Sequence, residues 1–521
     1  MRKYTVLLLL SGIICLGFFI RIYGSSNNFV FHHDQTDDLM ELRRTWDALK
    51  TGDIASIPLR GSGTGYKAFY ESPIFHGALY FYVHLPMAVV GNFHPYAVTL
   101  GGILLSTLAI WLLYLAGSWL FIPPVGLLAA FLFAVSYWMN DFARSFWPPS
   151  LVPFFALACL VGFAGVFRGK EKFFPLLAFG AAAASQMHNG GYVVLAFGLL
   201  SLLWFRLWPR SPRVMLATLV AFFVPILPTI VWEVQQGGPF FHLLEKILSV
   251  YGGGGTLTAS YRGILSVVDV AHEFFLFVTT SIGVISAYHR QMYGPIFTLL
   301  AIGAFVVCVG NKFLPKVSVG RYKKSLQLLA LWFIVFVPIP SLAAAYYGFD
   351  LSQGHSESIF GQIVGVPFVL LSFSILTVWL WRNRFLRFFI VAAILVMVHA
   401  NVTAINEFIW HNEGGKFTFG DKVRVGHAIA QDASGQPYEI EFRNWHEPGR
   451  DILYILTMEH LPWPERLNGA EKFIGWTGRE WALSGRPARI VYTLTSANGF
   501  PIEERDLLGV FGVLAVYKTV R

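Results

Sequence analysis

Residues 29–46 read FVFHHDQTDDLMELRRTW and follow shortly after the first long apolar run of the chain, residues 4–22. These eighteen residues hold two histidines, three aspartates, one glutamate and two arginines. From Asp37 to Leu49 the apolar side chains recur at helical spacing, which predicts an amphipathic helix on a membrane surface. Asp34 is expected just before this helix, near its N-cap. The predicted buried stripe consists of Leu39, Leu42, Trp46 and Leu49.

The composition places most of the chain in lipid. Of 521 residues, 55% are hydrophobic and only 13% are charged, whereas soluble domains carry roughly 25% charged residues. The net charge of +9 comes from basic residues in short breaks between apolar runs, as in cytoplasmic loops, so we expect no nucleic-acid partner. The sequence has no phosphate-binding glycine loop and no Cys/His cluster at metal-ligand spacing, so no nucleotide cofactor and no metal site are predicted.

A helix crosses the hydrocarbon core in about 20 apolar residues. The N-terminal run lacks a small-x-small cleavage site, so we interpret it as a retained first helix with its N-terminus in the cytoplasm. Two further segments, 73–91 and 264–288, are apolar but carry polar residues that lipid tolerates poorly. The clear candidate spans are 4–22, 95–117, 124–140, 150–167, 173–188, 191–208, 213–232, 292–310, 326–344, 358–380 and 386–405.

The basic loops distinguish 11 spans from 13. If neither ambiguous segment crosses, four basic loops share the cytoplasmic face. They are RGKEK (168–172), RLWPRSPR (206–213), NKFLPKVSVGRYKK (311–324) and WRNRFLR (381–387). If both segments cross, the first two of these loops move outside. The positive-inside rule therefore favours about 11 spans, with 13 as the alternative. The two ambiguous segments then become juxtamembrane helices in the outer interface.

The tail differs from the rest of the chain. Residues 1–405 form the predicted transmembrane module, whose first outer loop covers 23–94, and residues 406–521 form a predicted extracytoplasmic domain. Its strand-like segments are YEIEFRNW, ARIVYTL and LLGVFGVLAVYK, and GRDILYILTMEHL has helical spacing, so we expect a small α/β domain. A role as a lid or packing module is favoured over a catalytic role.

The acidic stretch suits proton transfer at the membrane surface. A carboxylate there acts as a general base when an acceptor hydroxyl or amine comes within hydrogen-bond reach. A lipid-phosphate leaving group needs cations or N–H donors on the same face, and the candidates are Lys67, Arg144, His188 and Arg262. The alternative is that Asp34 and Asp37 only cap the following helix.

The order of these segments resembles the first outer loop of the GT-C glycosyltransferases, in the branch of protein O-mannosyltransferases and the lipid A aminoarabinose transferase. That loop opens on Asp-Glu or Asp-Gln, followed by a helix ending in "L..GD" and a "GPLYYYL..P" segment. Here DQTDD, LMELRRTWDALKTGD and YESPIFHGALYFYVHLP stand in the same order. ARSFWPPSLVPFF (143–155) and QMHNGG (186–191) resemble two further stretches of bacterial members. The resemblance covers about residues 1–235.

This resemblance implies inverting transfer of a sugar from a polyprenyl-phosphate donor, without a cofactor, to a glycan, lipid or protein acceptor outside the cytoplasmic membrane. By position, Asp34 is the implied catalytic base, and Asp38 matches a second acidic residue. The sequence departs from the pattern at Gln35, where mannosyltransferases have Glu, and at 71–75, where aminoarabinose transferases have Lys-Pro-Pro. It also has a glycine-rich insertion, RGSGTGYKAFY (60–70).

Several residues are expected to contact substrate, and each has a simpler alternative. Lys67 is proposed to replace the missing phosphate-binding lysine. Arg144 binds phosphate, or reaches to the interface, or pairs with Asp141. His188 contacts the donor or holds local structure. Glu233 binds acceptor or faces solvent. The complete set of predicted substrate-binding residues is Asp38, Lys67, Tyr70, Glu71, Arg144, His188 and Glu233.

The sequence thus predicts a polytopic, all-α, GT-C-type glycosyltransferase of the inner membrane, moving a hexosyl or pentosyl group on the periplasmic or extracellular side. The alternative from another class is a transporter or flippase for lipid-linked sugars, which uses charges within the membrane. Sparse charges at mid-span argue against it. A third possibility, within the enzyme class, is a metal-dependent oligosaccharyltransferase or ligase acting on lipid-linked glycans.

Overall fold

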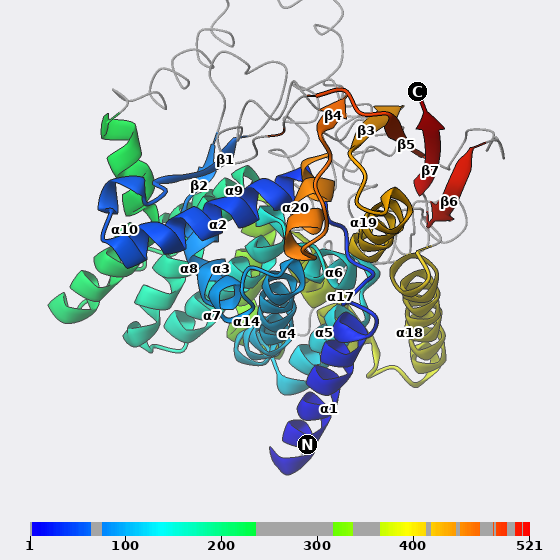
Figure 1. Ribbon diagram of the computed structural model, residues 1–521. Helices are drawn as coiled ribbons and strands as arrows, with labels where there is room; N and C mark the ends of the chain where they lie inside the picture. The colour runs from blue at the N-terminus through cyan, green and yellow to red at the C-terminus, as the bar shows by residue number, and fades with distance from the viewer. Residues whose placement is uncertain are drawn as a thin grey trace, which may run out of the picture.

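The computed structural model describes residues 3–63, 75–235, 316–336, 365–412, 418–443, 449–468, 483, 486–496, 506–512 and 514–521. Helices make up most of this part of the chain (Figure 1). The α-helices of the first 235 residues are α1 (Lys3–Ile22), α2 (His33–Thr51), α3 (Leu79–Val90), α4 (Pro95–Leu120), α5 (Pro123–Val135), α6 (Tyr137–Ala143), α7 (Val152–Phe167), α8 (Phe174–Met187), α9 (Tyr192–Trp204) and α10 (Pro212–Gln235).

Later helices continue the bundle and then lead into a sheet. The described ones are α14 (Lys316–Phe336), α17 (Val366–Leu380), α18 (Arg384–Ala404), the π-helical turn η9 (Ile405–Trp410), α19 (Phe419–Ala433) and α20 (Arg450–Met458). Short 3-10 turns are η1 (Ile54–Ser56), η3 (Pro148–Leu151), η4 (Glu171–Phe173) and η5 (Asn189–Gly191). The strands are β1 (Arg60–Gly63), β2 (Phe75–Gly77), β3 (Tyr438–Arg443), β4 (Arg466–Asn468), β5 (Ile490–Ser496), β6 (Leu507–Phe511) and β7 (Leu514–Val520).

The bundle has two chemically different ends, of which we call one the basic end. It is formed by residues 119–122, 168–172, 206–213 and 322–325. Arg168 donates to the Trp119 carbonyl over 3.2 Å, and the Ser325 hydroxyl donates to the Leu120 carbonyl over 2.9 Å. The Ser211 N–H donates to the Glu171 side chain over 3.3 Å, so the loops 168–172 and 206–213 meet at this end, beside the end of α4 and the first half of α14.

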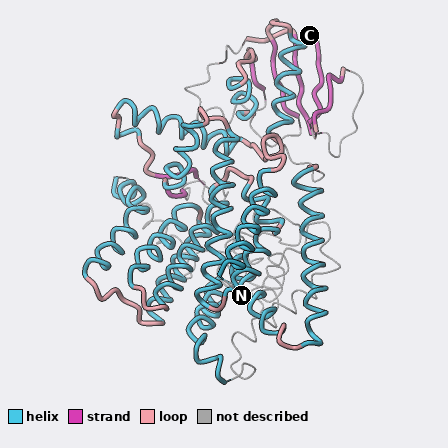
Figure 2. Tube along the Cα trace, turned by 90° about the horizontal axis from the view of Figure 1, so that it is seen from below, coloured by secondary structure: helices cyan, strands magenta, loops and turns pink. Residues whose placement is uncertain are grey.

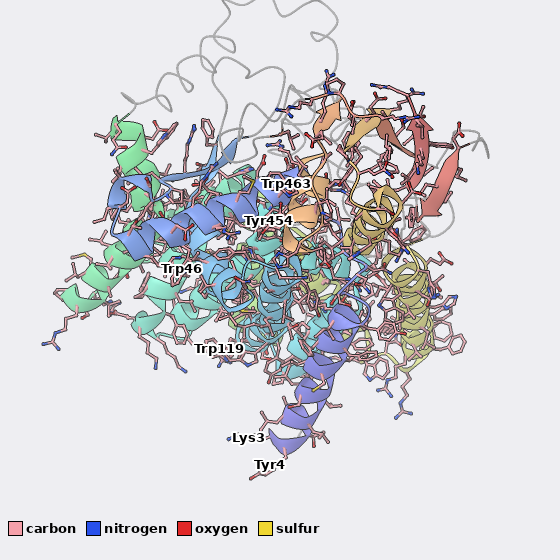
Figure 3. All side chains as sticks on the ribbon, viewed as in Figure 1. Lys3, Tyr4, Trp46, Trp119, Tyr454 and Trp463 are labelled. Carbon is pink, nitrogen blue, oxygen red and sulfur yellow. The ribbon has the colours of Figure 1, made fainter. Side chains whose placement is uncertain are left out.

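The opposite end, here the site end, is formed by residues 27–38, 75–77, 144–147, 186–190 and 229–233. The Thr229 hydroxyl donates to the Gln186 side chain over 2.6 Å, which joins the ends of α10 and α8. Helix α2 lies across this end of the bundle (Figure 1). The side-chain view places Lys3 at the far end of the molecule from Trp46 and Tyr454 (Figure 3).

Helix α3 does not cross the bundle. Before it, the Phe75 ring packs on Trp232 near the end of α10, with 5.4 Å between ring centroids. After it, the Phe93 carbonyl accepts a hydrogen bond from Tyr454 over 2.8 Å. Both ends of α3 therefore lie at the site end, as the basic loops indicated for segment 73–91. Segments 264–288 and 292–310 lie outside the described residues, so the total number of spans stays a prediction.

Several helices are long and apolar enough to cross a membrane. In the described part of the chain there are five, or up to six if the bent pair α5–α6 is counted as one span. They are Lys3–Ile22, Pro95–Leu120, Pro148–Phe167, Pro212–Gln235 and Arg384–Trp410. In α10 only 6% of the most apolar window is buried. Its outward side chains include Leu216 and Val224, so this helix presents an apolar surface suited to lipid.

Small residues let the central helices approach closely. A Cβ on Gly162 of α7 would lie 2.6 Å from the Leu177 backbone, and one on Gly180 of α8 would lie 2.4 Å from the Cys159 nitrogen. Deeper in the bundle the Trp332 and Phe368 rings stack, with centroids 3.6 Å apart. Association in lipid depends on such packing because lipid tails are as apolar as the side chains.

The predicted span 124–140 is not one straight helix. It is bent by 61° between α5 and α6, where Ser136 has extended backbone angles. The Tyr137 N–H, which continuous helix would use internally, donates to the Asn401 side chain over 2.7 Å. Arg21, fully buried, donates to the Ala134 carbonyl over 3.2 Å. The break is therefore stabilised because side chains satisfy the backbone groups that it frees.

The tail contains a sheet with its own core. Figure 2 shows its strands grouped together at one side of the helices. The strand order is β4-β3-β5-β7-β6, with β3 parallel to both β4 and β5, and β7 antiparallel to β5 and β6. The segments that the sequence predicts as strands form β3, β5, β6 and β7, and the predicted helix is α20. We call α19, α20 and β3–β7 the C-terminal unit.

Candidate active site

The acidic stretch forms the first turns of α2. This helix begins at His33, so Asp34 lies inside its first turn. The expectation that Asp34 precedes the helix is therefore wrong. The Gln35 side chain accepts a hydrogen bond from the His32 N–H over 2.7 Å, in a capping box. The N-cap is therefore His32. The Asp34 side chain is exposed, so it is accessible from outside the bundle.

The predicted apolar stripe of α2 is correct for three of its four residues. Leu39 and Leu42 are fully buried and Trp46 packs against the core. The prediction is wrong for Leu49, because this residue lies in the last turn of α2 and its side chain is 48% exposed.

The three aspartates of α2 have different surroundings. Asp38 is only 2% exposed and lies beside Tyr80 of α3. Burial, followed by the charge of Asp38, raises the pKa of Tyr80 well above its ordinary value. Asp37 accepts a hydrogen bond from Arg450 over 2.6 Å. Because Asp34 alone is exposed, it is the carboxylate of the three best placed to meet a substrate.

Two histidines lie next to this turn. The rings of His76, in β2, and His188, at the end of α8, have centroids 4.9 Å apart. Burial lowers the pKa of His76 to about 4, and the negative charge of Asp34 acts in the opposite direction. Within the described residues, the buried Nδ1 atom of His76 makes no hydrogen bond. The structure therefore brings Asp34, His76 and His188 together, with His76 uncharged at neutral pH.

The backbone of β2 approaches α8 so closely that Gly77 is required. A Cβ at this position would lie 2.1 Å from the Oε1 atom of Gln186. Gln186 is buried and is held by Thr229. This close approach sets His76 against His188, because Gly77 follows His76 and Gln186 lies two residues before His188.

Arg60, a cation that the sequence motifs did not indicate, lies near β2. The Arg60 guanidinium lies over the Phe75 ring, 3.6 Å from its centroid, and 5.3 Å from that of Trp232. Burial lowers the pKa of Arg60, while the charge of Glu41 raises it. Arg60 is the first residue of the glycine-rich insertion, and that position was its only signal in the sequence. The sequence signal for His76 was its position directly after the ESPIF segment, 71–75.

The remaining predicted residues lie apart or outside the described residues. Glu233 is half-buried near the end of α10. Arg144 is 2% exposed and donates to the carbonyls of Tyr23 and Asn28 over 2.8 and 3.0 Å. It thus holds the connection between α1 and α2, and its contact with phosphate stays a prediction. The predicted residues outside the described ones are Lys67, Tyr70, Glu71 and Arg262.

The low pKa of His76 predicts sensitivity to acid. Between pH 7 and pH 5 the His76 side chain takes up a proton in the unfolded state, where its pKa is near 6.5, but stays unprotonated in the folded state. This lowers the free energy of unfolding by about 2 kcal/mol. We therefore expect His76→Gln to lose less thermal stability on acidification than the parent. The exposed His411→Gln variant is the control. Equal acid sensitivity of parent and His76→Gln would contradict the assignment.

Residues 76–232 match a family of membrane glycosyltransferases. The matching model describes the dolichyl-phosphate-mannose-protein mannosyltransferases. This segment runs from His76 to Trp232 and includes both histidines of the pair. The match confirms the resemblance to GT-C glycosyltransferases that the motifs indicated. No curated protein sequence matches the chain significantly.

Among solved structures, the chain is similar to an Archaeoglobus fulgidus oligosaccharyltransferase crystallised with zinc and sulfate, at 10% identity and a TM-score of 0.49, covering 94% of this chain and 68% of that one. It is also similar to ArnT from Cupriavidus metallidurans bound to undecaprenyl phosphate, at 12% identity and a TM-score of 0.42, covering 99% and 98%. The arabinofuranosyltransferase AftD from Mycobacteria aligns at 14% identity and a TM-score of 0.45, covering 100% and 42%.

Proposed function

We propose that the protein transfers a sugar from a polyprenyl-phosphate donor to an acceptor at the outer face of the cytoplasmic membrane. The observation that carries this proposal is the exposed Asp34 beside the His76–His188 pair, at one end of a helical bundle whose residues 76–232 match a glycosyltransferase family. The acceptor is a glycan, a lipid or a protein.

In this reaction a nucleophilic oxygen or nitrogen of the acceptor attacks the anomeric carbon of the donor. The bond between that carbon and the phosphate oxygen breaks on the opposite face, which inverts the configuration. The acceptor proton moves to the Asp34 carboxylate, and polyprenyl phosphate leaves with the bonding electrons. General-base help of this kind typically contributes about 10²–10⁴-fold to a rate.

The surroundings of Asp34 suit the leaving group. At neutral pH an uncharged His76 offers a phosphate oxygen a hydrogen bond and not a full charge, because its pKa is about 4. The Arg60 guanidinium supplies positive charge at the same end of the bundle, and Lys67 is proposed to add a second cation. Such donors stabilise charge that develops on phosphate as the bond breaks.

The arrangement of charges supports an orientation. The basic end carries Arg168, Lys170 and Lys172, and the site end carries the aspartates of α2. By the positive-inside rule the basic end faces the cytoplasm. We therefore place the site, and residues 406–521 as a separate domain, on the periplasmic or extracellular side of the inner membrane, above a module of about 11 spans.

The test is transfer by the purified protein in proteoliposomes. The probes are undecaprenyl phosphates that each carry one hexose or pentose, offered with extracts of envelope glycans, lipids and proteins. We expect one donor to be consumed, with free undecaprenyl phosphate and a glycosylated product seen by mass spectrometry. Movement of an intact donor across the bilayer, without product, would overturn the proposal in favour of a flippase. Loss of transfer with EDTA and recovery with Mn²⁺ would add a metal requirement.

A further inference from the structure

The C-terminal unit is attached directly to the segment that precedes α2. The Phe419 N–H donates to the Phe29 carbonyl, and the Gly420 N–H donates to the Asn27 carbonyl, each over 2.9 Å. The Phe29 and Phe419 rings also stack, with centroids 5.0 Å apart. The start of α19 therefore holds residues 27–29 through both backbone and side-chain contacts.

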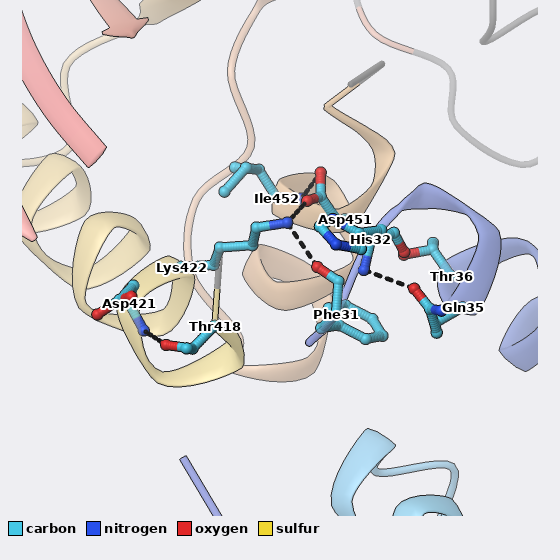
Figure 4. A network of polar contacts seen from close by, with 9 residues as sticks. All are labelled: Phe31, His32, Gln35, Thr36, Thr418, Asp421, Lys422, Asp451 and Ile452. Carbon is cyan, nitrogen blue, oxygen red and sulfur yellow. Dashed lines mark hydrogen bonds and ion pairs between the residues drawn. The ribbon is translucent and has the colours of Figure 1, made fainter. Parts of the chain in front are cut away.

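A buried ammonium group fixes the next residues. Lys422 of α19 is 0% exposed, and its Nζ donates to the Phe31 carbonyl and to the Asp451 carboxylate of α20 (Figure 4). Asp451 is only 1% exposed. Phe31 lies immediately before His32, the N-cap of α2. Since a buried charge must be paired, Phe31 has little freedom to move away from Lys422.

An ion pair holds α2 on the other side of Asp34. Arg450, at the start of α20, donates to Asp37 over 2.6 Å, and its side chain is only 5% exposed. Asp37 lies three residues after Asp34, on the same face of the helix. The C-terminal unit thus contacts the chain three residues before Asp34 and three residues after it.

We propose that the C-terminal unit positions Asp34 for proton transfer, with Lys422 and Arg450 as its positioning residues. This inference rests on the proposed function of Asp34. The first turn of a helix has free N–H groups and frays easily. The Arg450–Asp37 ion pair and the hydrogen bond from Lys422 to the Phe31 carbonyl oppose fraying at the place where the reacting carboxylate must be held. The unit is then part of the catalytic apparatus and not only a cover.

The decisive variant is Arg450→Met, which removes the charge and keeps an apolar stem of similar length. We expect hydrogen exchange of the amides of residues 33–39 to rise at least tenfold, with exchange elsewhere in α2 unchanged. Turnover of the sugar donor is expected to fall about 100-fold, as for a displacement of about 1 Å, with an unchanged KM. Arg450→Lys is expected to restore part of both effects, because it can still pair with Asp37.

The matched control is Arg424→Met. Arg424 forms an ion pair with Asp421 inside α19, so removing this pair breaks no contact with α2. Asp37→Asn and the double variant Asp37→Asn/Arg450→Met should match Arg450→Met, since the three share one lost contact. Unchanged exchange at residues 33–39 in Arg450→Met would overturn the positioning role, whatever the activity. Faster exchange in a protein whose parent transfers no sugar would instead count against the proposed function alone.

Discussion

Replacing Asp34 with asparagine is expected to lower the turnover of sugar transfer about 10³-fold, with little change in KM. Asparagine has the same size and can still accept hydrogen bonds in the first turn of α2, but its amide cannot take a proton from the acceptor. The expected size follows from the usual contribution of a general base, about 10²–10⁴-fold. Because the Asp34 side chain is exposed, the folded structure should not depend on its charge.

The measurement is the initial rate with a saturating lipid-linked donor, at matched amounts of folded protein in the membrane. Asp47→Asn is the control, because Asp47 is exposed on the same helix and forms an ion pair with the exposed Lys50 over 2.8 Å. A parental rate in Asp34→Asn would remove Asp34 from the mechanism. Loss of turnover in Asp38→Asn, with Asp34→Asn fully active, would move the base to the buried carboxylate.

Replacing Asp451 with leucine is expected to destabilise the C-terminal unit by about 3–5 kcal/mol. The change leaves the Lys422 ammonium fully buried with its carboxylate partner gone. The buried lysine must then lose its charge or draw in water, and either change weakens the contact with Phe31. The effect is measured as the free energy of opening from hydrogen exchange of the amides in α19 and α20.

The double variant Lys422→Met/Asp451→Leu should recover most of this loss, because replacing a buried ion pair by apolar side chains is often neutral. Glu441→Leu is the control from the same sheet region. Its partner Arg521 is half exposed, so its loss should cost less than about 1 kcal/mol. A double variant as unstable as Asp451→Leu alone would show that the fold depends on the ion pair itself and not on avoiding an unpaired charge.

The apolar runs predicted most of the described helices because crossing lipid requires long apolar segments. The sheet of the C-terminal unit was predictable for a similar reason, since alternating apolar residues mark β3, β5 and β7. The break at Ser136 was not predictable. It depends on Asn401 and Arg21, which are distant from Ser136 in the sequence. A pattern of apolar residues does not indicate such distant partners.

The candidate site was predicted in part. The acidic stretch identified Asp34, but the start of α2 was placed too late because Asp34 was taken for a cap. The capping box of His32 and Gln35 is an unusual version, without Ser or Thr at the N-cap. The role of His76 depends on the close approach of Gly77 to α8. A lone histidine between apolar residues gives no sign of such an approach.

The contacts of Lys422 and Arg450 have a consequence for biogenesis. They join residues that are 391 and 413 positions apart in the chain. The ribosome synthesises α2 long before α20, because translation proceeds from the N-terminus and N-terminal segments fold first. In a chain that has not yet been extended through α19 and α20, the acidic turn of α2 lacks the contacts with Lys422 and Arg450. Under the proposed function, we therefore expect a chain that ends before Lys422 and Arg450 to transfer no sugar.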